Sequence, residues 1–469
     1  MRIWFATFCE GLRANFWFIP TLMVIGATVL ALGLLYVDNH FITTIPPSLS
    51  YVYQGGADGA QSLLSTLASS VIGVAGTTFS ITIAALTLAS TQFGPRLLNN
   101  FVRDRGNQFV LGTYIATFTY CLLVLRTIRS SNNPSVEQAL VPHISVTVAV
   151  LLSLLNLGVL IYFINHIAIT IQINHVIATI GEDITKAVER LFPEQIGMGL
   201  HEFDDGSEEG KERFRDWFEA EAYAIQSDEG GYVQFVDTEA IMNLAKEHDV
   251  IIHLLHRPGD YVIGGSDLAF IYPAARVSED MAEQLNGTLA VGPNRTKQQD
   301  IQFSIDQLVE VAVRALSPAI NDPFTAITCV NELGEALCRL AQRRFPSSYR
   351  YDEDQHLRVI AESLSFKNVV DVAFDKIRNY AGDSTAVTLR MMEVIAIIMK
   401  CTRAQEQRAA LQRQADMILR GSEQKLAEEQ DRADVAERHE EVLRVLNRKE
   451  SDAQKHGSQC AVEVQASGV

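Results

Sequence analysis

A row of small and hydroxyl-bearing residues is the feature of this sequence that most suggests chemistry. The row lies in and just beyond a charge-free run at residues 63–90, and its members follow one another at alternating steps of four and three. This heptad spacing keeps them on one side of a helix, so the row must face protein or water and not lipid. Its members are Thr66, Ser70, Gly73, Thr77, Ser80, Ala84, Thr87 and Thr91.

Two interpretations of this row stay open. In the first, the small residues let helices approach closely, and the hydroxyl groups bond to backbone carbonyl oxygens. In the second, several copies of the helix surround an axis, and the hydroxyl groups line a pore that solvates an ion or a small solute. No charged residue in the run marks a selectivity filter, and His166 is the only ionisable group near the middle or end of the last apolar run.

The sequence gives little support for catalysis. Its six cysteines form no CxxC pair and no zinc spacing, and it contains neither a GxGxxG motif nor a phosphate-binding loop. Cysteines with this distribution are typical of reduced thiols in a cytoplasmic compartment. No nucleophile, metal cluster or paired carboxylates stand out. We therefore expect no enzymatic activity, no cofactor and no bound metal.

A second candidate site is the segment SPAINDPFTA at residues 317–326, between two predicted helices. Pro318 is expected to end the first helix, Asn321 or Asp322 to cap the second, and Pro323 to occupy its first position. Together with Ser317, these residues predict a structural corner, and a binding role for them stays open.

The elements that carry these residues begin with four predicted membrane spans. A bilayer core needs about 20 apolar residues in a helix, and runs of this kind lie at about 17–37, 63–90, 108–125 and 144–171. Arg2 and Arg13 precede the first span, and Arg96, Arg103 and Arg105 follow the second, whereas residues 38–62 contain no lysine or arginine. Basic residues favour the cytoplasmic side, so both termini are expected there.

Charge divides the chain in two. The net charge of −17 is concentrated beyond residue 171, because residues 1–171 carry +2 and the remainder −19. The acidic part has no basic face for nucleic acid. We expect a transmembrane domain at 1–173, a connecting helix at 174–200 that continues the fourth span, a strand-rich module at 213–295, a helical domain at 298–402, a charged helical tail at 403–450 and disorder at 451–469.

The predicted fold class is therefore an α-helical membrane protein with four transmembrane helices. It carries an α+β cytoplasmic region with a small strand-rich module and a helical C-terminal part. The sequence identifies no small ligand for the module. Within the strand-rich module, the pattern of turn residues and apolar residues from Pro258 to Leu268 is similar to that of small barrel-sandwich modules.

Three stretches together resemble one family, the bacterial membrane proteins grouped as domain of unknown function 2254. They are ASTQFGPRLLNNF at 89–101, the module from GYVQFVD to RPGDYVIGG at 231–265, and RALSPAINDPFTA at 314–326, with support from DVAFDKIRNYAG at 371–382. The resemblance covers roughly residues 10–400, and departs from the family at Gly94, where a serine is expected. It implies a bacterial inner-membrane location and carries over no activity.

Two functional hypotheses follow. The first is an oligomeric channel-like protein of the inner membrane, which passes ions or small solutes and is gated by its cytoplasmic domain. Its partners would be the lipid bilayer and further copies of the same chain. The alternative is a membrane-anchored scaffold or sensory regulator without transport activity, in which the row only packs helices.

Overall fold

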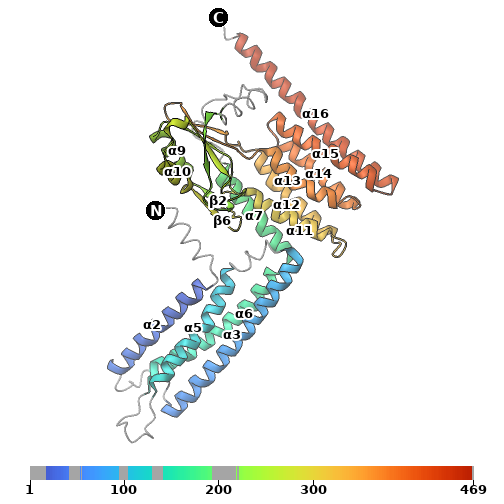
Figure 1. Ribbon diagram of the computed structural model, residues 1–469. Coiled ribbons are helices and arrows are strands. Elements are labelled where there is room, and N and C mark those ends of the chain that lie inside the picture. Colours follow the sequence, from blue (N-terminus) through green and yellow to red (C-terminus); the bar gives the residue numbers. More distant parts are fainter. Residues whose placement is uncertain are drawn as a thin grey trace. The chain divides into compact units, whose positions relative to one another are not determined.

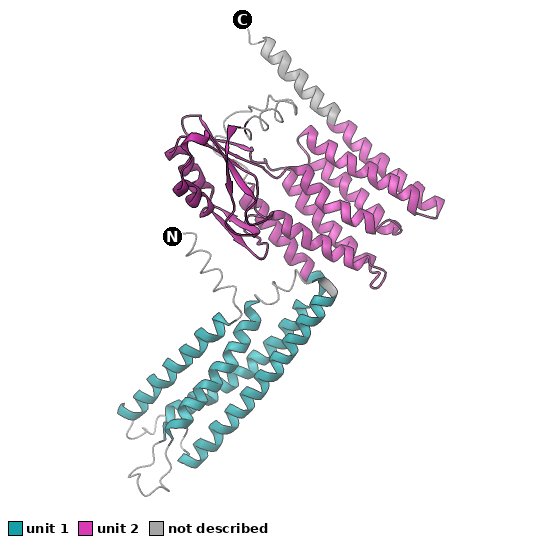
Figure 2. Ribbon diagram, in the orientation of Figure 1, with its two compact units in different colours: residues 1–175 teal, residues 176–469 magenta. Residues whose placement is uncertain are grey.

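The computed structural model describes residues 17–41, 53, 55–94, 104–128, 141–192, 218 and 221–466, with side chains up to residue 449. The chain forms two compact units, residues 1–175 and residues 176–469 (Figure 2). Arg2, Arg13, Arg96 and Arg103, on which the predicted orientation rests, lie outside the described residues, as do residues 193–200 of the expected connecting helix.

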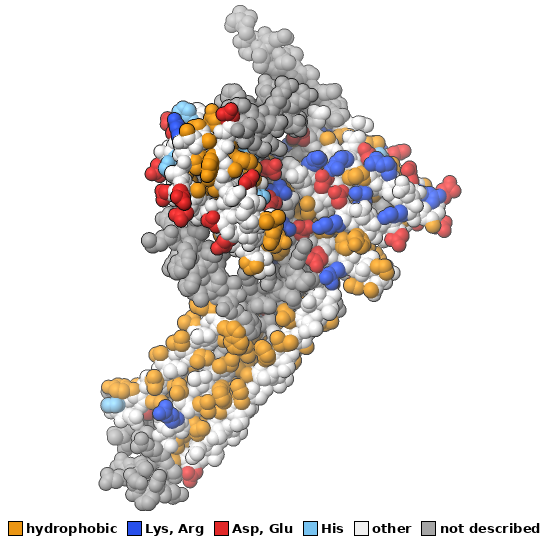
Figure 3. Space-filling view, viewed as in Figure 1, with side chains coloured by type: hydrophobic (Ala, Val, Ile, Leu, Met, Phe, Trp, Pro, Cys, Tyr) orange, Lys and Arg blue, Asp and Glu red, His pale blue; other side chains and the backbone are white. Residues whose placement is uncertain are grey.

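The first unit is a bundle of four helices, each long and apolar enough to cross a membrane. The central helix α5 contacts each of the other three (Figure 1). Large apolar side chains are exposed on the outside of the bundle, among them Leu22, Leu154 and Ile161, and they cover much of its visible surface in Figure 3. The four predicted spans are thereby confirmed as α2 (Phe18–Phe41), α3 (Ala57–Phe93), α5 (Arg105–Thr127) and α6 (His143–Thr170).

Two carboxylates join these helices at opposite ends of α6. At its start, Asp38 of α2 accepts hydrogen bonds from the backbone N–H groups of Ile144 and Ser145, at 3.1 and 3.0 Å. Near its end, His166 Nε2 lies 2.5 Å from Asp104 Oδ2. Asp104 also caps α5, because its other carboxylate oxygen accepts from the N–H group of Gly106.

The helix after the fourth span does not continue it without a break. The second unit's first helix, α7 (Ile173–Leu191), follows α6 after Ile171 and Gln172. There the N–H group of Gln172 donates to the carbonyl oxygen of Ile169, a tighter three-residue bond that interrupts the α-helical ladder. The connecting helix was expected to continue the fourth span, but the structure has two separate helices, α6 and α7, joined by two residues.

The strand-rich part of the second unit contains a five-stranded sheet in the order β1-β5-β3-β8-β7 and a three-stranded sheet in the order β4-β2-β6. Asp237 caps the helix that follows β2 by accepting from the N–H group of Ala240. The elements are β1 (Tyr223–Gln226), β2 (Gly231–Val236), α9 (Thr238–Glu247), β3 (Ile251–Leu254), β4 (Tyr261–Val262), β5 (Asp267–Tyr272), α10 (Glu279–Asn286) and β6 (Leu289–Gly292).

The division expected at residues 295–298 does not separate two folds. The hairpin of β7 (Tyr349–Tyr351) and β8 (Leu357–Ala361) arises within the part expected to be helical, and β8 pairs in parallel with β3. Strands of three and five residues are too short to show a clear alternation of apolar and polar residues, which is why the sequence did not indicate them.

The rest of the second unit is helical, and its last helices pack against the others. Leu411, Ile418 and Val442 are buried, so the segment 403–450, expected as a charged helical tail, packs into the helical body. The last helix includes residues 451–466, a stretch that we expected to be disordered. The helices are α11 (Ile301–Ala315), α12 (Pro323–Ala341), α13 (Phe366–Tyr380), α14 (Thr385–Cys401), α15 (Gln405–Lys425) and α16 (Glu429–Ala466).

Candidate functional site

The helix α3 has one face that packs within its own subunit. This face contacts α5 and α6, and it is built mainly from small residues, which permit close packing of helices in a membrane. Its buried members include Leu64, Ala68, Val71, Ala75, Thr78, Ala85 and Ala89. Ile72, Phe79, Ile83 and Leu88 are exposed beside it.

The predicted row lies on the opposite side of α3. At 100° per residue, its centre is about 150° from the centre of the buried face, and every member from Thr66 to Thr91 is exposed in the single subunit. A Cβ atom added to Gly73 or Gly76 would meet no other atom within 4 Å. The edge of the bundle formed by α3 is accordingly largely white in Figure 3, the colour of hydroxyl, glycine and backbone atoms.

Most hydroxyl groups of the row donate hydrogen bonds to the backbone of α3 itself. Thr77 Oγ1 donates to the carbonyl oxygen of Gly73 at 3.1 Å, and Ser80 Oγ donates to that of Gly76 at 2.9 Å. Thr66 and Thr87 donate to the carbonyl oxygens of Ser62 and Ile83 in the same way. A hydroxyl oxygen that donates its proton still has two lone pairs. The row therefore presents acceptor oxygen atoms along an uncovered helix face.

This arrangement offers acceptor oxygen atoms that can bind or solvate a partner. It holds neither a carboxylate nor a histidine, and the described residues contain no group of three or more histidine, cysteine, aspartate or glutamate side chains arranged to hold a metal ion. Acceptor oxygens favour a water molecule, a cation or a donor from another helix.

The corner between α11 and α12 uses its polar groups for its own turn. Asp322 caps α12 by accepting from the N–H and hydroxyl groups of Thr325, at 3.1 and 2.7 Å. These hydrogen bonds lower the pKa of Asp322. Pro323 is the first residue of the helix. Asn321 has a φ of 50°, in the left-handed region that asparagine tolerates well.

The other two predicted corner residues, Ser317 and Pro318, lie between the end of α11 and that turn. Helix α11 ends at Ala315, two residues before Ser317 and three before Pro318. Ser317 Oγ donates to the carbonyl oxygen of Arg314 at 2.7 Å. The five predicted corner residues therefore lie together between α11 and α12 in the second unit. The row on α3 is a separate candidate site, in the first unit.

The second unit contains a cavity of about 390 Å³ that the sequence did not indicate. It is lined by the end of α7, the starts of α9 and α11, the strands β3, β7 and β8, and the segments next to these strands. Three arginines line it: Arg190, Arg257 and Arg350. No local sequence motif predicts such a cavity, because its lining residues come from segments up to about 170 positions apart.

Two other arginines of the second unit show how it usually neutralises a half-buried cation. Arg295 donates to Asp300 at 2.7 Å and to Asp306 at 2.9 Å. Burial opposes the charge of Arg295, but the two carboxylates outweigh it and raise the pKa of the guanidinium. Arg358 likewise donates to Asp249 and Asp352, both at 2.7 Å.

Comparisons with known proteins agree with this architecture. A family model described as "Predicted membrane protein (DUF2254)" matches residues 13–396. Two uncharacterised proteins, from Mycobacterium bovis and Mycobacterium tuberculosis, are each 30% identical over 387 residues, which is 81% of this chain and 72% of theirs. No solved structure matches the chain. The chain therefore belongs to the DUF2254 family of predicted membrane proteins, as the resemblance of its three stretches indicated.

Proposed function

We propose that this protein is an oligomeric, channel-like protein of the bacterial inner membrane, without enzymatic activity, and that ions or small solutes pass along the α3 row. The supporting observation is that the subunit covers the opposite face of α3 and leaves the row open. A single bundle of four helices does not enclose that face, so several copies must meet around an axis to form an aqueous path.

The length of the row favours a pore lining over a packing motif. From Thr66 to Thr91 it extends roughly 38 Å along the helix, which exceeds a hydrocarbon core of about 30 Å. Helix pairs joined by small residues need only about two such residues, four positions apart. A row that continues through the whole membrane is what a continuous path for solutes requires.

We further propose that the acidic second unit lies in the cytoplasm with both chain termini, and that it controls the path. Only Ile171 and Gln172 separate α6 from α7. Helix α7 is anchored in the second unit by buried Ile177, Ile180 and Ile184. A movement of this unit would therefore act directly on the end of α6.

A membrane-anchored scaffold or sensory regulator is the second candidate, and one observation favours it. The open space beside Gly73 and Gly76 would admit the backbone of a second helix. Because the hydroxyl protons of Thr77 and Ser80 are already bonded within α3, a dry interface would leave no donor unsatisfied there.

Flux measurements distinguish the two candidates. Purified full-length protein in liposomes should conduct potassium or a small neutral solute. Thr77→Leu and Ser80→Leu should lower the flux at least tenfold, because leucine fills and dries the path. The control Ile83→Leu alters an exposed apolar position of the same helix and should conduct normally. Intact oligomers without flux would favour the scaffold, and a monomer in the bilayer would contradict both roles of the row.

A further inference from the structure

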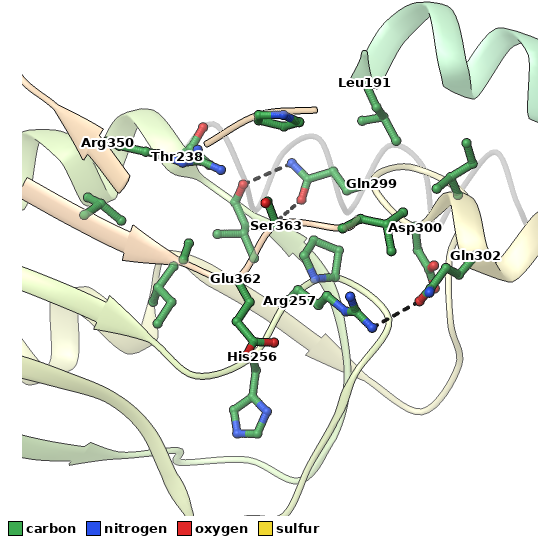
Figure 4. Close-up of a pocket in the computed structure, with 18 of the residues that line it drawn as sticks. Leu191, Thr238, His256, Arg257, Gln299, Asp300, Gln302, Arg350, Glu362 and Ser363 are labelled. Atoms are coloured by element: carbon green, nitrogen blue, oxygen red, sulfur yellow. Dashed lines mark hydrogen bonds between the residues drawn. The ribbon is translucent and has the colours of Figure 1, made fainter. Parts of the chain in front are cut away.

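The cavity in the second unit has the composition of a site for a small organic molecule. Its volume of about 390 Å³ lies within the range of about 300–1,000 Å³ usual for ligand pockets, which are mostly apolar with a few polar groups. Its apolar walls come from separate elements and include Leu191 of α7, Ile241 of α9, Leu254 of β3 and Val359 of β8. Figure 4 shows Arg350 and Thr238 at one end of this space and Arg257 and Gln302 at another.

Most polar groups that line the cavity already have partners. Arg190 donates to the carbonyl oxygens of Lys297 and Gln298, at 3.0 and 2.8 Å. Gln299 exchanges two hydrogen bonds with the backbone of Val236. These groups are held in place by hydrogen bonds to the protein, and the charge of Arg190 is exposed to solvent, so neither group depends on a ligand for a partner.

The same holds for two charged groups at the far end of the cavity. Arg257 lies 3.6 Å from Asp260 and donates to Gln302 at 3.3 Å. Asp300 is neutralised by Arg295 and caps α11 through the N–H group of Phe303. An anion in the cavity would therefore not meet an unpaired carboxylate there.

Arg350 is the exception. It is half-buried on β7, and within the described part of the chain its guanidinium has neither an ion pair nor a hydrogen bond. Burial accordingly lowers the pKa of Arg350, whereas paired carboxylates raise the pKa of Arg295 and Arg358. Glu362, the one other carboxylate among the described residues of the lining, is exposed and points away from Arg350 in Figure 4.

An arginine in this state is costly unless something neutralises it. Removing a guanidinium from water without a counter-ion is unfavourable. The arginines Arg295 and Arg358 each have two carboxylates within 2.9 Å, whereas the described residues supply none to Arg350. A carboxylate or phosphate group is the anion that a guanidinium binds best, through two parallel hydrogen bonds.

We propose that this cavity binds a small, soluble organic anion, whose carboxylate or phosphate group pairs with Arg350 and whose apolar body lies against Leu254, Ile241 and Val359. The ligand has the size of a substituted aromatic or short aliphatic acid, since larger molecules exceed the volume. All described residues of the site belong to the second unit. The proposed binding is therefore independent of whether the first unit, which contains the four membrane spans, conducts solutes.

Titration calorimetry on the full-length protein in neutral detergent tests this site. The probes are phenyl phosphate and benzoate, with inorganic phosphate lacking the apolar body and benzamide lacking the charge. At least one organic anion should bind saturably, and at least tenfold more tightly than benzamide or inorganic phosphate. Arg350→Gln should weaken that binding at least tenfold, and Arg350→Lys should weaken it less. Arg344→Gln, at an exposed arginine outside the cavity, should not change it.

The ligand-free proteins provide a second measurement. Arg350→Gln should unfold at the same temperature as the wild type or higher, because it removes a charge without a partner. A lower unfolding temperature would show that Arg350 is structural and would overturn the proposal. Equal binding by Arg350→Gln and wild type, binding of benzamide as tight as that of benzoate, or no saturable binding of either organic anion would also overturn it. Displacement of bound phenyl phosphate by phosphatidylglycerol vesicles would assign the site to a lipid headgroup and contradict the soluble ligand.

Discussion

Replacing Asp38 with alanine should destabilise the four-helix bundle of the first unit. Asp38 accepts three hydrogen bonds at the start of α6: from the N–H groups of Ile144 and Ser145, and from the hydroxyl of Ser145 at 2.7 Å. A side chain that caps a helix contributes about 1–2 kcal/mol, and a hydrogen bond to a charged group about 1.5–3 kcal/mol. Since bonds to one carboxylate are not additive, we expect a loss of about 3 kcal/mol in the free energy of unfolding.

Equilibrium unfolding of the purified protein in mixed micelles measures this loss. Asp38→Asn keeps an acceptor oxygen but loses the charge, so it should fall between alanine and wild type. The matched control is Asp58→Ala, an exposed aspartate in the first turn of α3, which should change stability by less than about 1 kcal/mol. If Asp38→Ala is no more destabilising than Asp58→Ala, the carboxylate does not join α2 to α6 and the reasoning is refuted.

Three further changes test other parts of the structure by the same unfolding measurement. Asn156→Leu should stabilise the membrane unit by about 1–3 kcal/mol, since the amide is 4% exposed and has no partner in the described part; a loss would contradict this. Arg295→Met should cost about 3–5 kcal/mol by leaving Asp300 buried without its cation, and a neutral result would refute the pairing. The hydrogen bond from Arg358 holds the pKa of Asp352 at about 2, below its usual 3.8. The stability from that bond is therefore complete above pH 3.8 and is lost as the pH falls through 2; Asp352→Asn should remove this dependence, and an unchanged acid profile would exclude it.

The membrane unit was predictable from the sequence because its signals are local. A charge-free run of about 20 residues is sufficient to indicate a span, and all four were confirmed. The heptad spacing likewise places Thr77 and Ser80 on one side of α3. It does not reveal which neighbour covers that side, because this depends on how α5 and α6 pack against the helix.

The second unit was less predictable because its key features join distant segments. The strand β8 finds its partner β3 about 100 residues earlier in the chain, and neither is long enough to identify the pairing. That Arg350 has no partner among the described residues depends on its neighbours in space, since Asp352, a carboxylate close to it in the sequence, pairs with Arg358 instead. The segment 403–450 was predicted only as a charged helical tail because its apolar residues are sparse, whereas in the structure Leu411 and Ile418 are buried.

The central claim is that the α3 row faces water in the assembled protein, and thiol labelling in liposomes tests it most directly. In a chain with all six native cysteines replaced, Thr77→Cys and Ser80→Cys should react with a charged reagent that does not cross the bilayer. Ile83→Cys and Ile161→Cys, at exposed apolar positions of α3 and α6, should stay unreactive. Protection of both row positions, in protein that is shown to be oligomeric, would contradict the account and leave the row as a dry contact between helices.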